Sequence, residues 1–537
     1  MQNRHLLLSV LCAGASLVAA PAFGQAPPPA LPPVATDVVP PPPPVVVAPT
    51  GLTVQLSTLH LVREKGVLSQ AEYESALRDI TDSAGGRGDD ATTLMVSKFA
   101  ATLYGFVEAD SIWDSTQSLN DSAGSAAIAR PSTYAGSNSR MTFGVRNSRL
   151  GIRLKSPETS WFRASGVLEA DFLGATLPIG AGQPYYGTEA AFFNNPTFRV
   201  RHAYLKFETP VVDILMGQYW HLFGWGGNYF PSTVQIQGIP GEVYNRTTQI
   251  RLSHTFKSSA VQVELAVAAM RSPQRNAGTP EGTAGLRMLF PTWTGVQTQS
   301  STGTAIAPAS IAVSGTVRKL LLPPLSGAAT SSTTEYNELW GKGIAVDAFI
   351  PVIPATRATR GNSLSLNGEF SYGHGLADLY TGLTGGVSNP ALPVPAPTMA
   401  TPNPVAPTYT PDLDPGIAMY NYVTGLAEAV QWTTFNVGVQ YYLPGLDGRL
   451  FVTGNVLSSS SANSGDFLGV AANAKPAAIA TAQGKVRKSE MVYDANIFAD
   501  PYPGVRFGLE YAHFADTYLD GITAVNHRVQ FSGFYIF

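Results

Sequence analysis

The chain has 537 residues, a formal net charge of −3 and only 13% charged residues, while glycine and proline number 52 and 41. So small a net charge argues against a general polyanion-binding protein, and no nucleic-acid partner is expected. Cys12 is the only cysteine. Because it lies in a segment expected to be removed, a disulfide framework, a cysteine metal site and a thiol nucleophile are excluded from the mature chain.

Residues 1–24 have the pattern of a secretory signal peptide. Polar Arg4 and His5 precede an apolar core over residues 6–20, and residues 22–24 form the cleavage site, so the mature chain is expected to begin near Gln25. The apolar core is too short for a stable transmembrane anchor. We therefore expect an exported protein.

Three further segments precede the main domain, and all are expected in the periplasm. Residues 25–50 are a low-complexity run of proline, alanine and valine, which predicts an extended spacer without a packed core. Residues 51–82 predict two short helices, the second opened by a capping box at Ser69 to Glu72. They fit a helical hairpin or a short coiled coil equally well, and a glycine-rich linker over residues 83–98 follows.

Residues 99–537 alternate in hydropathy with period two, in segments of about ten residues, as transmembrane strands do. No apolar run of about twenty residues follows the signal, so a chain that crosses lipid must satisfy its backbone in a closed sheet. The pattern predicts an all-β transmembrane barrel of about 16 antiparallel strands, with both ends in the periplasm. The expected strands cover residues 101–113, 143–155, 161–173, 198–208, 212–223, 246–256, 260–270, 283–290, 308–320, 340–352, 363–374, 431–442, 449–458, 486–498, 505–515 and 525–537.

The connections between these strands alternate between short and long, as expected for periplasmic turns and external loops. One connection breaks the rule, because residues 291–308 are long where a tight turn is due. Either a strand pair is misplaced there or the turn carries an insertion. The largest external loop, residues 376–430, is rich in proline and should shape the external mouth or contact the outside world.

The connection over residues 224–245 is rich in glycine, proline and aromatic residues. So many large apolar groups would be a liability in external solvent, which favours a loop folded into the barrel over an exposed surface loop. The residues expected to narrow the lumen are Trp225, Tyr229, Phe230, Glu242 and Tyr244.

Strand periodicity also predicts which side chains point into the lumen. Leu150, Ile152 and Leu154 share one face, so Arg149 and Arg153 must face water. A lipid-facing arginine near the midplane would cost roughly 2–4 kcal/mol. The same reasoning gives a basic wall of Arg149, Arg153, Arg163, Arg199, Arg201, Arg251, Arg506 and Arg528, and acidic lumen residues Glu108, Asp110, Glu169, Asp171, Glu369, Asp494 and Glu510.

The two signs are segregated along the sequence, which predicts a basic wall that faces an acidic one across the opening. Such a transverse field favours anionic or dipolar solutes. The alternative is that the arginines and carboxylates form salt-bridge ladders that only hold the wall together. Aromatic residues near strand ends, among them Trp113, Tyr204, Tyr219 and Tyr511, are expected in the girdles at the lipid interfaces.

The last strand ends at Phe537, with Val529, Phe531, Gly533 and Tyr535 on the same face, as closing strands of bacterial outer-membrane barrels do. Together with the signal peptide, this ending predicts a location in the outer membrane, with its lipid as a partner.

Several stretches are similar to the DcaP-like porins, over roughly residues 103–255 and the last two strands. They are residues 146–151 (RNSRLG), 168–172 (LEADF), 201–204 (RHAY), 216–220 (MGQYW) and 246–251 (RTTQIR). The resemblance implies a homotrimeric outer-membrane diffusion channel with an N-terminal periplasmic helical extension. It also implies a preference for small anionic or carboxylate solutes.

Other functions have less support. A barrel enzyme would need His202, His254 or His513 beside a nucleophile, and the sequence has no Gly-x-Ser-x-Gly context, so no catalytic residue is predicted. The pairs Asp412 with Asp414 and Asp516 with Asp520 could bind Ca²⁺, although solvated turn residues explain them as well. No cofactor or metal motif is found. The sequence predicts passive diffusion of small hydrophilic solutes; the alternative is a plugged structural or adhesive barrel.

Overall fold

The computed structural model describes residues 93–96, 99–125, 127–157, 159, 161–174, 197–235, 238–274, 277–299, 301–325, 335–356 and 359–537. The predicted signal peptide, spacer and helical hairpin lie outside these residues. Part of the predicted linker does not: Thr93–Val96 forms strand β1, which pairs with the start of β2 (Phe99–Asp114).

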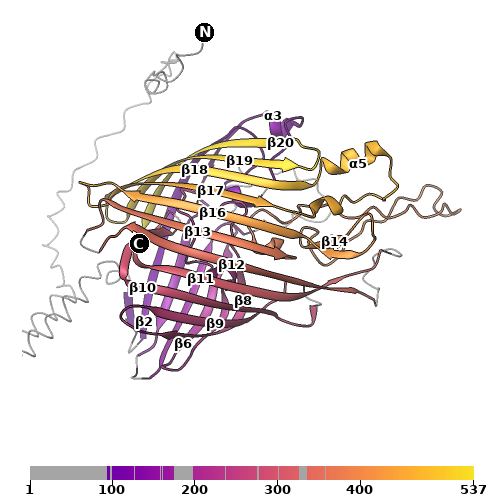
Figure 1. The fold of residues 1–537 in the computed structure, drawn as a ribbon. Helices are drawn as coiled ribbons and strands as arrows, with labels where there is room; N and C mark the ends of the chain where they lie inside the picture. Colours follow the sequence, from indigo (N-terminus) through magenta and orange to yellow (C-terminus); the bar gives the residue numbers. More distant parts are fainter. Residues whose placement is uncertain are drawn as a thin grey trace, which may run out of the picture. The chain divides into compact units, whose positions relative to one another are not determined.

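The rest of the described chain forms a closed antiparallel barrel (Figure 1). Strands β3 (Arg140–Gly144) and β4 (Arg149–Lys155) both pair with β2 and together form one wall strand. The last strand, β20 (Thr523–Ile536), pairs with β2 and closes the ring. The strands between are β5 (Arg163–Asp171), β6 (Arg199–Glu208), β7 (Asp213–Trp220), β8 (Arg246–Phe256), β9 (Gln262–Met270), β10 (Glu281–Gln299), β11 (Gly303–Leu322), β12 (Asn337–Ile353), β13 (Ser363–His374), β16 (Gln431–Tyr442), β17 (Leu450–Ser460), β18 (Arg487–Tyr502) and β19 (Val505–Tyr518).

With β1 left out and β3 and β4 counted together, the 18-stranded sheet is a ring of 16 strands, which confirms the predicted fold class and strand count. A small external sheet of β14 (Ala418–Tyr420) and β15 (Ala427–Ala429) lies within the largest loop. Short helices η1 (Ala123–Ser125), α3 (Tyr134–Ser137), η4 (Ala377–Leu379), η5 (Ser464–Asp466) and α5 (Pro476–Gln483) belong to the external connections.

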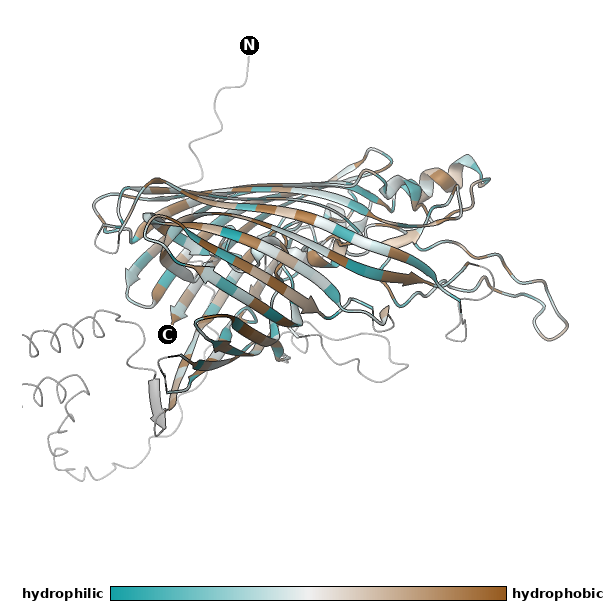
Figure 2. Cartoon of the chain, turned by 60° about the horizontal axis from the view of Figure 1, so that its bottom comes forward, coloured by the Kyte–Doolittle hydropathy of each residue, from teal (hydrophilic) through white to brown (hydrophobic). Residues whose placement is uncertain are grey.

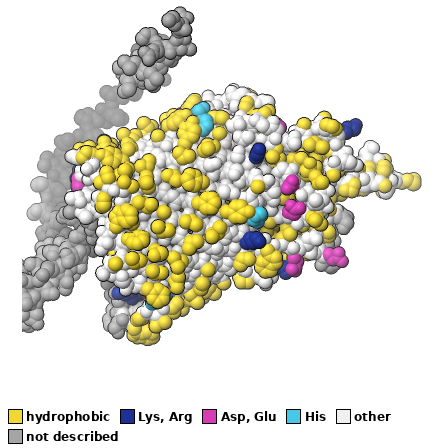
Figure 3. All heavy atoms as spheres, viewed as in Figure 1, with side chains coloured by type: hydrophobic (Ala, Val, Ile, Leu, Met, Phe, Trp, Pro, Cys, Tyr) yellow, Lys and Arg dark blue, Asp and Glu magenta, His cyan; other side chains and the backbone are white. Residues whose placement is uncertain are grey.

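Side chains of the wall are apolar outside and polar inside, the reverse of a soluble protein. On β16, Phe435, Val437 and Val439 are exposed, whereas Asn436 and Gln440 are at most 2% exposed. Figure 3 shows apolar side chains spread over the outer surface of the strands, and Figure 2 shows hydrophobic and hydrophilic residues alternating along them. Such a surface suits a lipid bilayer. Within the described ranges, no helix is long and apolar enough to cross a membrane.

The irregular connection over residues 291–308 is a β-hairpin that continues past the barrel wall. The pairing of β10 with β11 breaks between Phe290 and Thr294, then resumes from the Thr294 and Pro308 pair to the Gln299 and Gly303 pair. Both neighbouring strands lie where the sequence predicted them. Of the two explanations offered for this connection, the insertion is therefore the right one.

The largest external loop packs down onto the barrel. Leu376, Leu379, Tyr380 and Ile417 are at most 3% exposed and belong to a cluster that also contains Val243 from the connection after β7. Met399, further along the loop, is fully exposed. The base of this loop thus covers part of the external mouth, as predicted, while its middle projects away.

Candidate pore and its constriction

The connection between β7 and β8 crosses the lumen. It begins with the short helix η2 (Phe223–Trp225), where Trp225 Nε1 donates to the Val313 carbonyl of β11 at 3.1 Å. Further along, Asn455 Nδ2 of β17 donates to the Ser232 carbonyl at 3.0 Å, and Gln235 N–H donates to Glu510 Oε2 of β19 at 2.9 Å. A segment that touches β11, β17 and β19 lies inside the barrel, so the loop is inserted, as the sequence predicted.

The five residues expected to narrow the lumen all lie in this loop, and they differ in how deeply they are buried. Trp225, Tyr229, Phe230 and Glu242 are 2–9% exposed, and Tyr244 is half-buried. Phe230 and Tyr244 pack on Trp220 at ring distances of 4.7 and 4.9 Å. The loop is therefore a packed layer inside the lumen.

The acidic residues of the later strands are covered by this layer. Glu510 accepts the Gln235 amide, and Glu369 Oε1 accepts the Val243 amide at 3.1 Å. Asp494 accepts from Asn455 at 2.8 Å. Glu369, Asp494 and Glu510 are at most 8% exposed. The prediction that they face a basic wall across the opening is therefore wrong, because loop amides bond Glu369 and Glu510, and wall asparagines bond Asp494.

The arginines of β4 and β6 do gather on one side. Arg201 contacts Glu169 at 2.8 Å and Asp171 at 3.0 Å, and Arg199 contacts Asp171 at 2.6 Å. Arg149 lies 3.6 Å from Glu169. Arg246, which the sequence reasoning missed, joins them above the rings of Trp220 and Tyr244. Four guanidinium groups thus surround two carboxylates, so a salt-bridge ladder exists and positive charge is in excess.

A β-bulge explains part of this cluster. The register between β5 and β6 shifts at Glu169 and Ala170, so that Arg201 and His202 both point inward, 1% and 6% exposed. A bulge reverses the facing of every later residue of its strand. Tyr204 therefore points into the lumen, as does Tyr219 from β7, at 4.8 Å. The expectation that these two tyrosines belong to a lipid girdle is wrong, because the bulge turns Tyr204 inward and both rings line the same lumen cavity.

Below the loop, on the periplasmic side, a cavity of about 760 Å³ opens between β5 and β10. We call this cavity the vestibule. Tyr204 and Tyr219 line it, together with three carboxylates, Glu208, Asp213 and Glu264. Its five basic side chains are the predicted Arg163 and Arg251, and Lys206, Lys257 and Arg287, which the sequence reasoning missed.

The basic groups of the vestibule differ in their partners. Lys206 contacts Glu208 at 2.8 Å, and Arg287 contacts Glu264 at 3.0 Å. Arg251 instead donates to neutral acceptors, Gln249 Oε1 at 2.9 Å and the Trp220 carbonyl at 2.6 Å. The hydrogen-bond partners of Arg251 thus bring no negative charge to it.

The remaining predicted lumen residues lie outside the cluster and the vestibule. Arg153 stacks over Tyr104, while Arg528 is fully buried against Asp114 at 2.9 Å. Arg506 pairs with Asp500 at 2.6 Å and is 4% exposed. Glu108 and Asp110 point inward as predicted but are at most 4% exposed, and Asp110 accepts from Ser532 at 2.6 Å. The buried ones among them, Arg506, Arg528, Glu108 and Asp110, hold the wall rather than face an opening.

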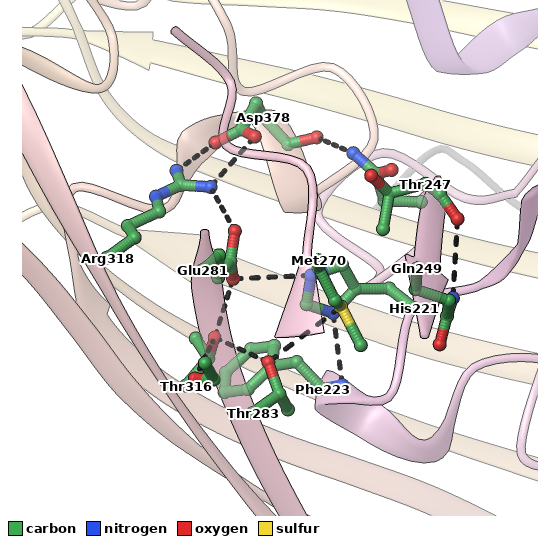
Figure 4. A network of polar contacts seen from close by, with 12 residues as sticks. His221, Phe223, Thr247, Gln249, Met270, Glu281, Thr283, Thr316, Arg318 and Asp378 are labelled. Carbon is green, nitrogen blue, oxygen red and sulfur yellow. Dashed lines mark hydrogen bonds and ion pairs between the residues drawn. The ribbon is translucent and has the colours of Figure 1, made fainter. Parts of the chain in front are cut away.

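A buried polar network fixes the base of the inserted loop to the wall (Figure 4). Arg318 of β11 contacts Glu281 of β10 at 3.3 Å and Asp378 of the largest loop. Glu281 also contacts His221 at 3.2 Å, and the His221 ring accepts the Phe223 amide at 3.1 Å. Both loops are thereby tied to the same two strands.

The residues considered for catalysis and calcium binding have other surroundings. His254 packs on Phe256 and His513 stacks on Tyr493, both at 4.5 Å. Asp414 accepts the amides of Gly385 and Gly416 at 2.7 and 2.8 Å. Asp520 pairs with Arg130. The carboxylates thus serve turns and an ion pair.

No family model matches the chain, and no curated protein matches it. Among solved structures, the outer membrane channel DcaP of Acinetobacter baumannii aligns with a TM-score of 0.55 and 16% identity, over 82% of this chain and 99% of that one. The chain has the fold of that channel. The DcaP resemblance expected from the sequence is thus confirmed at the level of the fold.

Two other solved structures align less well with this DcaP-like fold. An anion-selective porin from Comamonas acidovorans has a TM-score of 0.43 and 10% identity, over 82% of this chain and 100% of that one. The trimer form of OmpT from Vibrio cholerae has a TM-score of 0.42 and 9% identity, with the same coverage.

Proposed function

We propose that this chain is an outer-membrane porin through which small hydrophilic solutes diffuse passively, with a preference for anions. The observation that carries the proposal is the excess of basic side chains on the unfilled side of the lumen. Among the residues that the structure describes, five basic groups and three carboxylates line the vestibule, and four arginines lie around two carboxylates next to it. In a low-dielectric channel, such an excess attracts anions and repels cations.

The apolar outer surface supports a location in the lipid bilayer. The unequal lengths of the wall strands support an oligomer. Strands β5, β6 and β7 have 9, 10 and 8 residues, whereas β10, β11 and β12 have 19, 20 and 17. A strand needs about 9–11 residues to span the hydrocarbon. The short side of the wall is therefore the side that neighbouring copies would cover, which agrees with the homotrimer implied by the family resemblance. Cross-linking in native membranes should give a ladder that ends at three copies.

The test of function is single-channel conductance of the purified protein in a planar bilayer under a salt gradient. We expect stepwise openings and a reversal potential that favours anions. Replacing Arg163 and Arg251 together by Gln should lower the anion preference. Arg130→Gln is the matched control, because this arginine pairs with Asp520 in the external loops. An equal change in both variants would contradict the assignment of the vestibule as the selective region.

The competing reading is a plugged structural or adhesive barrel, and the packed layer inside the lumen favours it. Folded protein that inserts into bilayers without any conductance would support that reading and overturn the porin proposal.

A further inference from the structure

The hairpin formed by residues 294–299 and 301–307, which we call the periplasmic hairpin, lies inside the barrel mouth. Val296, Thr298 and Ser301 have no exposed surface. On β16, Gln440 accepts the Thr298 amide at 2.9 Å and donates to the Thr298 carbonyl at 2.8 Å. On β19, Arg506 donates to Thr304 Oγ1 at 3.2 Å and to the Ser301 carbonyl. Strands β12, β13, β16, β17 and β18 separate β11 from β19, so the hairpin crosses the periplasmic mouth.

The periplasmic hairpin meets the inserted loop from below. Gln297 and Gln299 both donate from Nε2 to the Asn228 carbonyl, at 2.9 and 2.6 Å. Val296 shares one buried apolar cluster with Val234 of the loop. The cluster also contains wall aromatics, and it consists of Phe106, Val234, Val296, Ala355, Tyr442, Phe451, Phe498 and Phe534. The hairpin and the loop therefore form one packed body with this part of the wall.

The lumen thus has two different halves. We call the side bounded by β13, β16, β17, β18, β19 and β20 the filled half, because its inward residues lie beneath the loop and the hairpin. The side between β5 and β10 is the open half. All residues that line the vestibule lie between Thr159 and Arg287, so they belong to the open half.

We propose that the periplasmic hairpin is a fixed partition that closes the filled half and confines solutes to the vestibule. Its backbone bonds to β16, its cross-lumen bonds to β19 and its contacts with the inserted loop hold it from three sides, which argues against a swinging lid. The partition contributes to selectivity, because it closes the half whose carboxylates on β13 and β19 the inserted loop already covers, and so makes the basic vestibule the route. Only its effect on solutes rests on the proposed porin function.

Two inward serines provide a matched pair of probes. Ser253 of β8 lines the vestibule, whereas Ser365 of β13 has no exposed surface and donates to the Val296 carbonyl at 2.9 Å. We would make Ser253→Cys and Ser365→Cys separately, with Cys12 replaced by Ser, and treat the folded protein with a small anionic methanethiosulfonate. We expect rapid labelling at position 253, with loss of current, and no labelling at position 365. Equal labelling rates would overturn the partition.

A shortened hairpin gives the second test. Replacing residues 291–308 by Asn-Gly joins Phe290 to Ala309, which are already paired, through a turn that suits two-residue hairpins. In this background, position 365 should become reactive, because the Val296 carbonyl that covers it is gone. Conductance should rise only slightly, because the inserted loop still covers Glu369 and Glu510 of the filled half. An unreactive position 365 in a folded shortened variant would contradict the proposal.

Should the shortened variant not fold, the labelling contrast in the full-length protein still decides the question. Absence of conductance in every variant would refute the proposed porin function alone, because the labelling contrast does not depend on current.

Discussion

The filled half and the open half of the lumen are built from the same alternating strands, yet they treat inward polar groups differently. In the filled half, Glu510, Asp494 and Glu369 are bonded to amides of the loop or to asparagines and are shielded from water. In the open half, Arg251 and its neighbours line a cavity of about 760 Å³. Buried charges need partners, whereas charges beside water keep their long-range field. The difference teaches that inward facing on a barrel strand does not by itself make a residue part of the pore.

The largest effect is expected from breaking a buried ion pair on the filled side. Arg528 and Asp114 are 0% and 1% exposed. Arg528→Ala leaves the Asp114 carboxylate buried without its cation, which should cost about 3–5 kcal/mol in the free energy of unfolding. This loss is measured by urea unfolding in lipid, monitored by tryptophan fluorescence. Arg163→Ala in the open half should change stability by no more than about 0.5 kcal/mol. Equal losses would erase the distinction between the halves.

A smaller loss of stability is expected from the aromatic stack. Phe451 stacks on Tyr442 and on Phe498, each at 4.7 Å. Phe451→Leu keeps most of the volume but removes the stacking, so we expect a loss of about 1–2 kcal/mol. The same unfolding experiment applies. Trp161→Leu, at an aromatic residue that is 66% exposed, should leave the transition unchanged.

Selectivity should respond unequally to two arginines of the open half. Arg251 donates to neutral acceptors, whereas Arg287 contacts Glu264. A unit charge a few ångströms from the ion path contributes about 1 kcal/mol in water, so Arg251→Gln should lower the anion-to-cation permeability ratio by roughly two- to five-fold. Arg287→Gln should change it less. Reversal potentials under a salt gradient measure both, and the opposite order would show that carboxylate pairing does not decide which arginine acts on solutes.

The smallest effect is expected at Glu242, and it depends on pH. Burial, and then the nearby carboxylate of Glu369, raises the pKa of Glu242 well above its ordinary value. Above about pH 4.3 the unfolded chain has released the Glu242 proton, whereas the folded protein still holds it. The free energy of unfolding therefore falls as pH rises from about 4.3 toward the raised pKa of the folded carboxyl group. Glu242→Gln should match the parent at pH 5 and withstand alkaline pH better. Thermal melts of both proteins between pH 5 and pH 9 would show this difference in stability. Identical pH profiles would contradict the raised pKa of Glu242.

The sequence predicted the ring of strands because lipid on one side and polar contacts on the other impose period two on each wall strand. It also predicted the inserted loop, because aromatic residues such as Trp225 and Phe230 suit a buried segment better than external solvent. The basic side of the lumen was predicted in part, through Arg149, Arg199, Arg201 and Arg251.

Other features depend on contacts that no local pattern records. The bulge at Arg201 and His202 reverses the facing of Tyr204 and Lys206, and a parity count has no means to detect it. The Gln235 amide that donates to Glu510 lies 275 positions away from it in the sequence. The periplasmic hairpin left a signal, the overlong connection at residues 291–308, but its destination across the mouth depends on Gln440 and Arg506, which lie far away in the sequence.

The seam where the barrel closes has a practical consequence. Phe537 and Gly105 exchange backbone hydrogen bonds at 2.9 and 3.0 Å, and Ser532 bonds to Asp110 across 422 positions of the chain. Contacts of such long range form late, because the loop-closure entropy must be overcome first. An affinity tag fused to Phe537 would extend the strand at its last pairing position and interfere with this step. The fully exposed Met399 marks a better insertion point, in the middle of the largest external loop, which projects away from the barrel wall.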